Sequence, residues 1–215
     1  MALRILIIGA GHVGAALGLG WLAVGHDVLF AVKDPASGKY DSLPRDRLVE
    51  ANAPHGADIV VLATPYAAAV PALEVIGGAR GLTVIDCTNP LGMGPDGLHL
   101  TLGFDTSGAE AIAAAFPEAH LFKTLNQTGA ENMAEARAYH PTPVMFVAGD
   151  AADRKPQVMG LVTDLGFHVV DAGPLSAARL LEPLAMLWIE LALKRGQARD
   201  FAFSMVRHPR RPIEP

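Results

Sequence analysis

The stretch that decides the fold is Leu3-Arg4-Ile5-Leu6-Ile7-Ile8, which runs directly into Gly9-Ala10-Gly11-His12-Val13-Gly14. Its first part does not alternate apolar with polar residues, which is typical of a strand covered on both faces in a parallel sheet. In the turn that follows, Gly9 permits a tight bend, Gly11 lets backbone approach a pyrophosphate, and Gly14 lets a helix pack closely on the strand. The stretch therefore predicts a strand, a phosphate-binding turn and a helix whose first amides face the phosphates.

A Gly-x-Gly-x-x-Gly turn carries little information by itself, because the chain holds 22 glycines among 215 residues. The residues around it are more informative. A helical pattern continues to Ala23, Gly25 stands where a helix C-cap is expected, and a second strand follows over residues 27–32. We interpret the turn as a dinucleotide-binding site, with an ordinary glycine-rich turn as the alternative.

The composition is that of a globular α/β protein, with 51% hydrophobic and 18% charged residues. A net charge of -5 gives no attraction for nucleic acid, and basic residues are not interleaved with aromatics. Residues 1–25 are apolar, but their glycines would destabilise a free-standing helix, so we expect neither a signal peptide nor membrane attachment. The only cysteine, Cys87, ends an apolar run and is expected to be buried, which suits a cytoplasmic protein.

The end of the second strand is where this kind of fold selects its cofactor. Lys33 follows Gly14 at about the 20-residue separation at which an acid binds the ribose of NAD or a base accepts the 2'-phosphate of NADP. A base comes first here, so Lys33, helped by Lys39, favours NADP. Asp34 would repel the phosphate if it pointed inward, and NAD is the alternative cofactor.

Further polar turns are expected at the same edge of the sheet, because the carboxyl ends of parallel strands meet there. Strands over residues 58–63, 82–86 and 120–125 run into such turns, and two more strands are expected over 144–148 and 167–171. The first turn contains Thr64, expected as a helix N-cap, and Pro65, expected as the first helical residue. The second contains Asn89, which could hold a ribose or a nicotinamide amide, or form an Asx turn before Pro90.

The third turn, Asn126-Gln127-Thr128, is the expected lining of a pocket for the reaction partner of the cofactor. Lys123, in the strand before it, is a further candidate or else a structural lysine with a buried stem. Thr128 is also a candidate cap for the helix that follows.

Helices are predicted over residues 45–53, over 108–116 behind a Ser107 and Glu110 capping box, over 153–165, and from Ser176 onward. Residues 91–103 are expected to form a loop. In the last helix, Arg179 and Glu182 lie one turn apart and are expected to form an ion pair. The fold class predicted is α/β, with a Rossmann-type, doubly wound, mostly parallel sheet and a short C-terminal helical segment.

Several motifs together resemble one family, the NADPH-dependent reductases of the deazaflavin coenzyme F420, which also occur as the cytosolic domain of membrane ferric reductases. The likeness spans nearly the whole chain and rests on residues 7–14, 63–65, 85–90, 123–126, 149–150 and 171–179. The last segment is the most specific, because it belongs to no general dinucleotide-binding fold.

The resemblance implies an NAD(P)-binding domain over residues 1–172, a C-terminal helical segment and tail over 173–215, and a homodimer, which we expect to form through the last helix. It also implies NADP as cofactor, with coenzyme F420 or a flavin as the small-molecule acceptor of the hydride. Family members grip the 2'-phosphate with a Ser-Arg pair, at positions that look like Val32 and Lys33 here. The expected cofactor-binding residues are Gly9, Ala10, Gly11, His12, Val13, Gly14, Val32, Lys33, Ala63, Thr64, Pro65, Asn89 and Pro90, and the expected catalytic residues are Asn126, Gln127 and Thr128.

The sequence thus predicts an NADP-dependent oxidoreductase with neither a metal-ligand cluster nor a Ser/His/Asp set. Two alternatives stay open. One is a redox sensor that binds NADP without turnover, because a fold does not by itself prove chemistry. The other is a dehydrogenase of small hydroxyacids or imines, which would share the N-terminal half.

Overall fold

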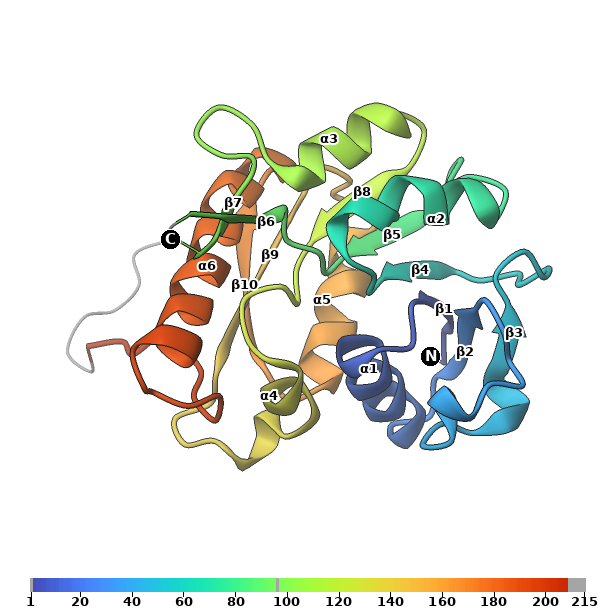
Figure 1. Cartoon of the computed structure of the whole chain (residues 1–215), viewed down its shortest axis with the longest axis horizontal. Coiled ribbons are helices and arrows are strands. Elements are labelled where there is room, and N and C mark those ends of the chain that lie inside the picture. The colour runs from blue at the N-terminus through green and yellow to red at the C-terminus, as the bar shows by residue number, and fades with distance from the viewer. Residues whose placement is uncertain (1, 96, 209–215) are drawn as a thin grey trace.

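The computed structural model describes residues 2–95 and 97–208, and its centre is an eight-stranded sheet (Figure 1). The strand order is β10-β9-β8-β5-β4-β1-β2-β3. Neighbouring strands are parallel except β8 and β9, so β9 and β10 run against the rest. The strands of this sheet are β1 (Arg4–Ile8), β2 (Asp27–Val32), β3 (Leu48–Glu50), β4 (Ile59–Leu62), β5 (Thr83–Asp86), β8 (His120–Lys123), β9 (Val144–Gly149) and β10 (His168–Gly173).

The sheet is doubly wound, as expected, and each strand expected from the sequence is present. Its order reverses at β1, which pairs with β2 on one side and with β4 on the other. In open α/β sheets, a reversal of this kind is where ligands bind, beyond the carboxyl ends of the strands. The switch point of this fold therefore lies at the glycine turn after β1.

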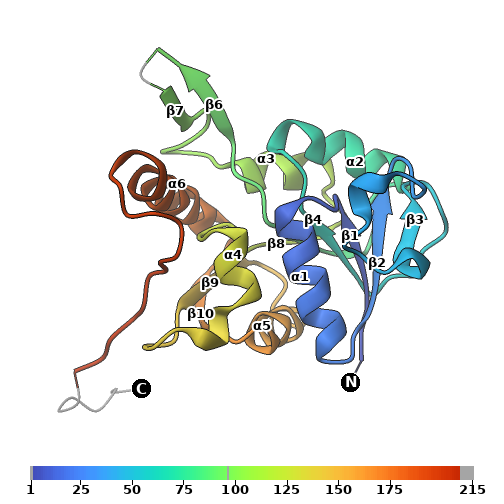
Figure 2. The ribbon, with the colours of Figure 1, turned by 60° about the horizontal axis from the view of Figure 1, so that its bottom comes forward.

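Helices cover both faces of the sheet (Figure 2). Ile5 and Ile7 of β1 pack in a core cluster with residues of α1, α4 and α5, whereas Leu6 and Ile8 pack in a second cluster with residues of α2 and α3. Because both faces of β1 are buried, the strand is apolar at successive positions. The α-helices of the described ranges are α1 (His12–Ala23), α2 (Ala69–Val75), α3 (Gly108–Ala115), α4 (Ala130–Ala134), α5 (Lys155–Asp164) and α6 (Ala178–Lys194).

Two helix ends follow the sequence signals. Helix α1 ends at Ala23, and Gly25 beyond it has the left-handed φ of 93° that a C-terminal glycine supplies. Ser107 caps α3, because its Oγ accepts a hydrogen bond of 3.2 Å from the amide of Glu110.

Two other expected caps are wrong. Pro65 keeps an extended ψ of 144°, so a 3-10 turn over Tyr66–Ala68 precedes α2 and Thr64 caps nothing. Gly129, not Thr128, is the N-cap of α4, with no side-chain hydrogen bond. In both cases the chain turns one residue later than the local cap signal predicts.

The helix expected over residues 45–53 is also wrong. Arg45–Arg47 form a short 3-10 turn, and Leu48–Glu50 form β3 at the sheet edge. Leu48 is buried opposite Phe30 of β2, and this pairing outweighs a weak local helix preference.

The segment expected as a loop over residues 91–103 contains an antiparallel hairpin of β6 (Leu91–Gly94) and β7 (Gly97–Leu100). Figure 2 shows the hairpin standing out from the sheet, on the side of α6. Met93 on the hairpin and Phe104 just after it are exposed, and Phe104 has a φ of 61°. The hairpin and α6 therefore carry apolar surface that the described chain leaves uncovered.

Helix α6 divides its apolar residues between the interior and the surface. Leu181, Ala185 and Trp188 are buried, whereas Leu180 and Leu187 are exposed.

No helix in residues 2–95 or 97–208 combines the length and the apolar character that a bilayer span requires.

The chain after α6 folds back over α4. The ring of Trp188 stacks on Phe201 with centroids 5.3 Å apart, and its Nε1 donates to the carbonyl oxygen of Phe201. Asn132 of α4 donates to the carbonyl oxygens of Arg199 and Phe201. The part of the tail beyond His208 lies outside the described residues.

Candidate cofactor site

The turn between β1 and α1 has no room for side chains where it is tight. A Cβ at Gly9, whose φ is 97°, would lie 2.7 Å from the carbonyl oxygen of Ala63. A Cβ at Gly14 would lie 1.9 Å from the carbonyl oxygen of Gly9. At Gly11, in contrast, nothing lies within 4 Å of such an atom. The turn thus has the geometry that the three glycines predict, closed on the protein side and open on the outer side.

The first amides of α1 open at this turn. Gly11 is the N-cap, no side chain caps the helix, and its first turn has no acidic residue. His12 is exposed, Val13 half-buried and Gly14 buried. Uncapped amides at the positive end of a helix favour an anion, so this turn can accept a phosphate group.

A cavity of about 440 Å³ lies between the segments that follow β1, β2 and β4. Tyr40, Ala51 and Ala68 belong to its lining, although the sequence analysis did not select them. Tyr40 and Ala68 end short 3-10 turns and Ala51 directly follows β3, and no periodic sequence pattern marks such positions. Of the expected cofactor-binding residues, the cavity brings together Gly9, Ala10, Gly11, Val32, Lys33, Ala63, Thr64 and Pro65.

Two lysines line the cavity. Lys33 and Lys39 are both exposed, and Lys39 Nζ lies 5.6 Å from the centroid of the Tyr40 ring. The carboxylate of Asp34 accepts a hydrogen bond of 3.0 Å from the amide of Ala36, so it is engaged in the loop's own backbone. Asp34 is not part of the cavity lining, and the cavity therefore has a basic rim.

Thr64 gives a direct test of whether the cavity fits a polar ligand. Its Oγ1 is buried and has no hydrogen-bond partner among the described residues. A buried hydroxyl without a partner costs about 1–3 kcal/mol, which a ligand oxygen or nitrogen would recover. Together with the open backbone at Gly11 and the basic rim, this hydroxyl fits a phosphorylated nucleotide.

A second group of polar side chains lies at the ends of β5 and β8. Asn126 Nδ2 donates to Asn89 Oδ1 at 2.9 Å, and Asn89 Nδ2 donates to the carbonyl oxygen of Asn126 at 3.1 Å. Gln127 Nε2 donates to Asn126 Oδ1 and to the carbonyl oxygen of Phe146. The structure thus joins Asn89 to the adjacent residues Asn126 and Gln127, which begin 37 positions later in the sequence, in one hydrogen-bonded network.

The remaining site candidates lie on either side of this network. Thr128 is half-buried, and its Oγ1 accepts a hydrogen bond from Asn132 of α4. Pro90 is buried, and its carbonyl oxygen accepts hydrogen bonds from the amide and hydroxyl of Thr101. These candidates therefore share the carboxyl edge of the sheet with the cavity but do not line it.

Lys123 is neither a snorkelling nor a pocket-lining residue. Its side chain is fully buried, with Nζ 2.8 Å from Asp86 Oδ2 and 3.0 Å from Glu182 Oε1. The expected ion pair of Arg179 with Glu182 is therefore wrong, and Arg179 instead pairs with Glu110 of α3. Sequence periodicity could not find this cluster, because its members come from β5, β8 and α6.

Tyr66 packs beside this cluster. A Cβ on Gly108 would lie 2.9 Å from the Tyr66 ring and 3.2 Å from Glu182 Oε1, so the ring and the carboxylate meet there. Burial raises the pKa of the Tyr66 phenol, and the carboxylates of Glu182 and Asp86 add to this. The phenol is therefore held in its protonated form.

Cys87 is a buried structural thiol, as expected. Burial raises its pKa, and the neighbouring Asp86 carboxylate acts in the same direction, so it is no nucleophile at neutral pH. Within the described ranges, no group of three His, Cys, Asp or Glu residues is placed to hold a metal ion.

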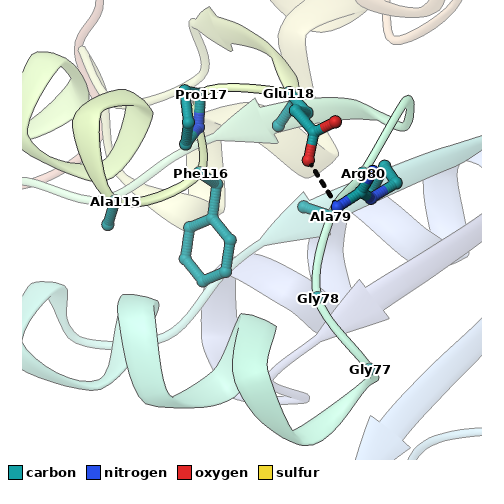
Figure 3. Close-up of a pocket in the computed structure, with 9 residues that line it drawn as sticks. Gly77, Gly78, Ala79, Arg80, Ala115, Phe116, Pro117 and Glu118 are labelled. Atoms are coloured by element: carbon teal, nitrogen blue, oxygen red, sulfur yellow. Dashed lines mark ion pairs between the residues drawn. The ribbon is translucent and has the colours of Figure 1, made fainter.

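A smaller cavity of about 250 Å³ lies at the opposite edge of the sheet, where β5 and β8 begin (Figure 3). Arg80 and Glu118 form an ion pair of 2.8 Å across it, with both side chains largely exposed. It is remote from the glycine turn and from the asparagine network, so we do not assign it to the site.

Fold and site together define a dinucleotide-binding protein of Rossmann type. The family described as "NADP oxidoreductase coenzyme F420-dependent" matches residues 4–90. The crystal structure of a proposed F420-dependent NADP-reductase from Arthrobacter sp. FB24 is 31% identical, covers 96% of this chain and 100% of that one, and has a TM-score of 0.86. The chain belongs to the family of coenzyme F420-dependent NADP oxidoreductases, as the motifs predict, and is an NADP-dependent oxidoreductase.

Two other solved structures place this fold among its neighbours. A hypothetical protein from Sinorhizobium meliloti, SMa0349, is 28% identical over 83% of this chain and 88% of that one, with a TM-score of 0.70. A reductive aminase from Aspergillus terreus in complex with NADPH is 20% identical, covers 91% of this chain but 64% of that one, and has a TM-score of 0.64. The second likeness concerns the fold alone.

Proposed function

We propose that this oxidoreductase transfers a hydride between NADP(H) and a deazaflavin, coenzyme F420, or a flavin-like ring. The observation that carries the proposal is the cavity at the switch point, with its open Gly11 backbone and its two lysines. A cavity of that lining suits the phosphorylated half of NADP. The asparagine network lies at the same edge, and its half-buried member Asn89 is the one most open to a redox ring.

The proposed roles follow from the geometry. The amides after Gly11 would hold the pyrophosphate, the Thr64 hydroxyl a ribose or phosphate oxygen, and Lys33 with Lys39 the 2'-phosphate. Asn89 would orient the nicotinamide side of the cofactor. Bound NADPH would supply the hydride, or bound NADP+ would accept it, so the protein's task is positioning, not acid or base chemistry.

The acceptor would lie against Asn126, Gln127 and Thr128. Asn126 and Gln127 are almost fully buried and held by hydrogen bonds to neighbouring strands, so they form a rigid wall. A rigid wall suits direct hydride transfer, which depends on the distance and alignment of two rings. The buried Cys87, with no second cysteine in the chain, supports our inference that the enzyme works in the reducing cytoplasm.

The acceptor is tested by turnover. We expect NADPH absorbance to fall when oxidised coenzyme F420 or FMN is added, and ferric chelates serve as the third acceptor class. Loss of NADPH only with ketoacids or imines would favour the dehydrogenase alternative. NADPH binding without turnover on any acceptor would favour the redox sensor and contradict the proposal.

The cofactor preference is tested at Lys33. Lys33→Ala should weaken NADPH binding by about tenfold or more while leaving NADH nearly unchanged, because only NADPH carries the 2'-phosphate. Arg80→Ala is the matched control, since it removes a positive charge at the opposite edge of the sheet. Equal losses of NADPH and NADH affinity at Lys33 would contradict its assignment.

We also propose a division of the chain into a dinucleotide-binding domain, residues 1–172, and a C-terminal helical segment, residues 173–215. We propose further that two copies of the chain form a dimer through this C-terminal segment. A groove of about 640 Å³ between α6 and the segment after β7 is lined by Leu180, Pro183 and Phe104, whose side chain is fully exposed. A protruding Phe104 and an apolar groove on one surface are self-complementary, as a two-fold interface requires. Leu180→Asp should convert a dimer into a monomer in sedimentation, and a wild-type monomer would contradict the proposal.

A further inference from the structure

The ion cluster of Asp86, Lys123 and Glu182 carries an unbalanced charge inside the protein. All three side chains are buried, with exposed fractions of 0%, 0% and 1%. Lys123 contributes one positive charge against two carboxylates. The described residues add no second cation to the cluster, since Arg179, one turn before Glu182, is committed to Glu110.

Backbone amides donate hydrogen bonds to both carboxylates of the cluster. Glu182 accepts hydrogen bonds of 2.9 and 3.1 Å from the amides of Gly108 and Ala109 at the start of α3. Asp86 accepts one of 2.9 Å from the amide of Thr88. Donors aimed at a carboxylate favour its ionised state. The amides at the start of α3 contribute only about half a positive charge, so the cluster stays negative.

Lys123 also stays charged. Burial acts to lower the pKa of its ammonium, but the carboxylates of Asp86 and Glu182 outweigh this and raise the pKa. The carbonyl oxygen of Thr88 accepts a further hydrogen bond from Nζ. The cluster therefore combines one ammonium, whose charged form its neighbours favour, with two buried carboxylates.

The cluster lies at the carboxyl ends of β5 and β8, beside the asparagine network. Asp86 and Lys123 are the last residues of β5 and β8. Asn89 and Asn126, which are hydrogen-bonded to each other, follow within three residues of these strand ends. The excess negative charge thus lies just inside the edge where the proposed function places the nicotinamide.

We infer that the Asp86, Lys123 and Glu182 cluster favours the oxidised, positively charged nicotinamide over the neutral, reduced one. The inference rests on the proposed function. When hydride leaves bound NADPH, two electrons and one proton pass to the acceptor ring, which is reduced, and the nicotinamide ring gains a positive charge. A buried negative charge nearby stabilises that ring and so promotes hydride donation.

Glu182→Gln tests the inference by binding, without turnover. Removal of one negative charge should weaken NADP+ about tenfold relative to NADPH, at a charge separation of about 10 Å and an effective dielectric constant of about 20. Asp86→Asn should act in the same direction. Glu118→Gln, at the opposite edge of the sheet, is the matched control and should leave the ratio of the two dissociation constants unchanged.

An unchanged ratio in both cluster variants, or an equal loss for NADP+ and NADPH, would show a purely structural cluster and overturn the inference. If neither variant folds, the dissociation constants of the unaltered protein for NADP+ and NADPH provide the test. The inference predicts that NADP+ binds at least as tightly as NADPH. Binding of NADPH more than about tenfold tighter than NADP+ would overturn the inference. Failure of the unaltered protein to bind either nucleotide would instead contradict the proposed function itself.

Discussion

Lys123→Met removes the cation that pairs with Asp86 and Glu182, and methionine replaces much of the apolar part of the lysine side chain. Asp86 and Glu182 would then face each other without a counter-charge, both shielded from water. Breaking a buried ion pair in this way costs about 3–5 kcal/mol. Because domains are stable by about 5–15 kcal/mol, we expect a folded variant with a much lower free energy of unfolding.

The pH dependence separates this cause from a simple loss of packing. Repulsion between the two carboxylates raises the pKa of one of them above its unfolded value of about 4. A group whose pKa is raised by folding stabilises the protein below its unfolded pKa, and this contribution is lost as the pH rises through the folded pKa. The variant should therefore be least impaired near about pH 5 and most impaired near about pH 8.

Urea unfolding, followed by tryptophan fluorescence at both pH values, measures this effect. Lys155→Met is the matched control, because Lys155 pairs with the half-exposed Asp171 and should contribute less than about 1 kcal/mol. Adding Glu182→Gln to Lys123→Met removes one of the repelling carboxylates and should restore part of the stability. A loss below about 1 kcal/mol, or the same loss at every pH, would refute the reasoning.

Three further changes test other parts of the structure. Gly14→Ala places a Cβ 1.9 Å from the Gly9 carbonyl oxygen, so calorimetry should show NADPH affinity reduced by at least about tenfold, and unchanged affinity would contradict the packing role. Glu110→Gln removes a carboxylate whose pKa Arg179 lowers, so the loss of stability in urea unfolding should be fully present above about pH 5 and should shrink as the pH falls below about 4. Trp188→Ala should cost about 3 kcal/mol and expose the Phe201 segment to proteases, and wild-type resistance would argue against that packing.

The parts of the fold that the sequence predicts are those specified by local patterns. The apolar run of β1 and the three glycines after it depend on backbone geometry within a few residues, and the structure reproduces both. The Ser107 cap is similarly local, since donor and acceptor lie three residues apart. Within the site, the lining residues that directly follow β1 and β4 obey the same rule, because parallel strands bring their carboxyl ends together, whereas this rule does not predict Tyr40, Ala51 and Ala68.

The errors share a physical cause in contacts between distant segments. β3 is a short edge strand that exists because it pairs with β2, and its own residues carry no strong strand signal. Thr64 looks like an N-cap by residue type, yet its chain stays extended through Pro65, and its buried hydroxyl has no hydrogen-bond partner among the described residues. The local rule therefore failed at Thr64 because the 3-10 turn begins only at Tyr66, beyond the reach of a cap at that position.

Glu182 shows why the buried cluster could not be predicted from one helix. On an isolated helix, a pair of Arg179 and Glu182 at one-turn spacing is worth about 0.2–0.5 kcal/mol. In the folded protein, Glu182 instead receives two amides of α3 and the ammonium of Lys123, and each hydrogen bond to a charged group is worth about 1.5–3 kcal/mol. Because these three interactions are stronger in sum, the Glu182 side chain points toward α3 and Lys123, and Arg179 pairs with Glu110 instead. Helix α6 is thus held to the start of α3 by two carboxylates, Glu182 of α6 and Glu110 of α3. The partners of Arg179 and Glu182 lie more than 50 residues away in the sequence. Only the folded chain therefore reveals that Glu182 is buried near the proposed redox edge, in a cluster with two carboxylates and one ammonium.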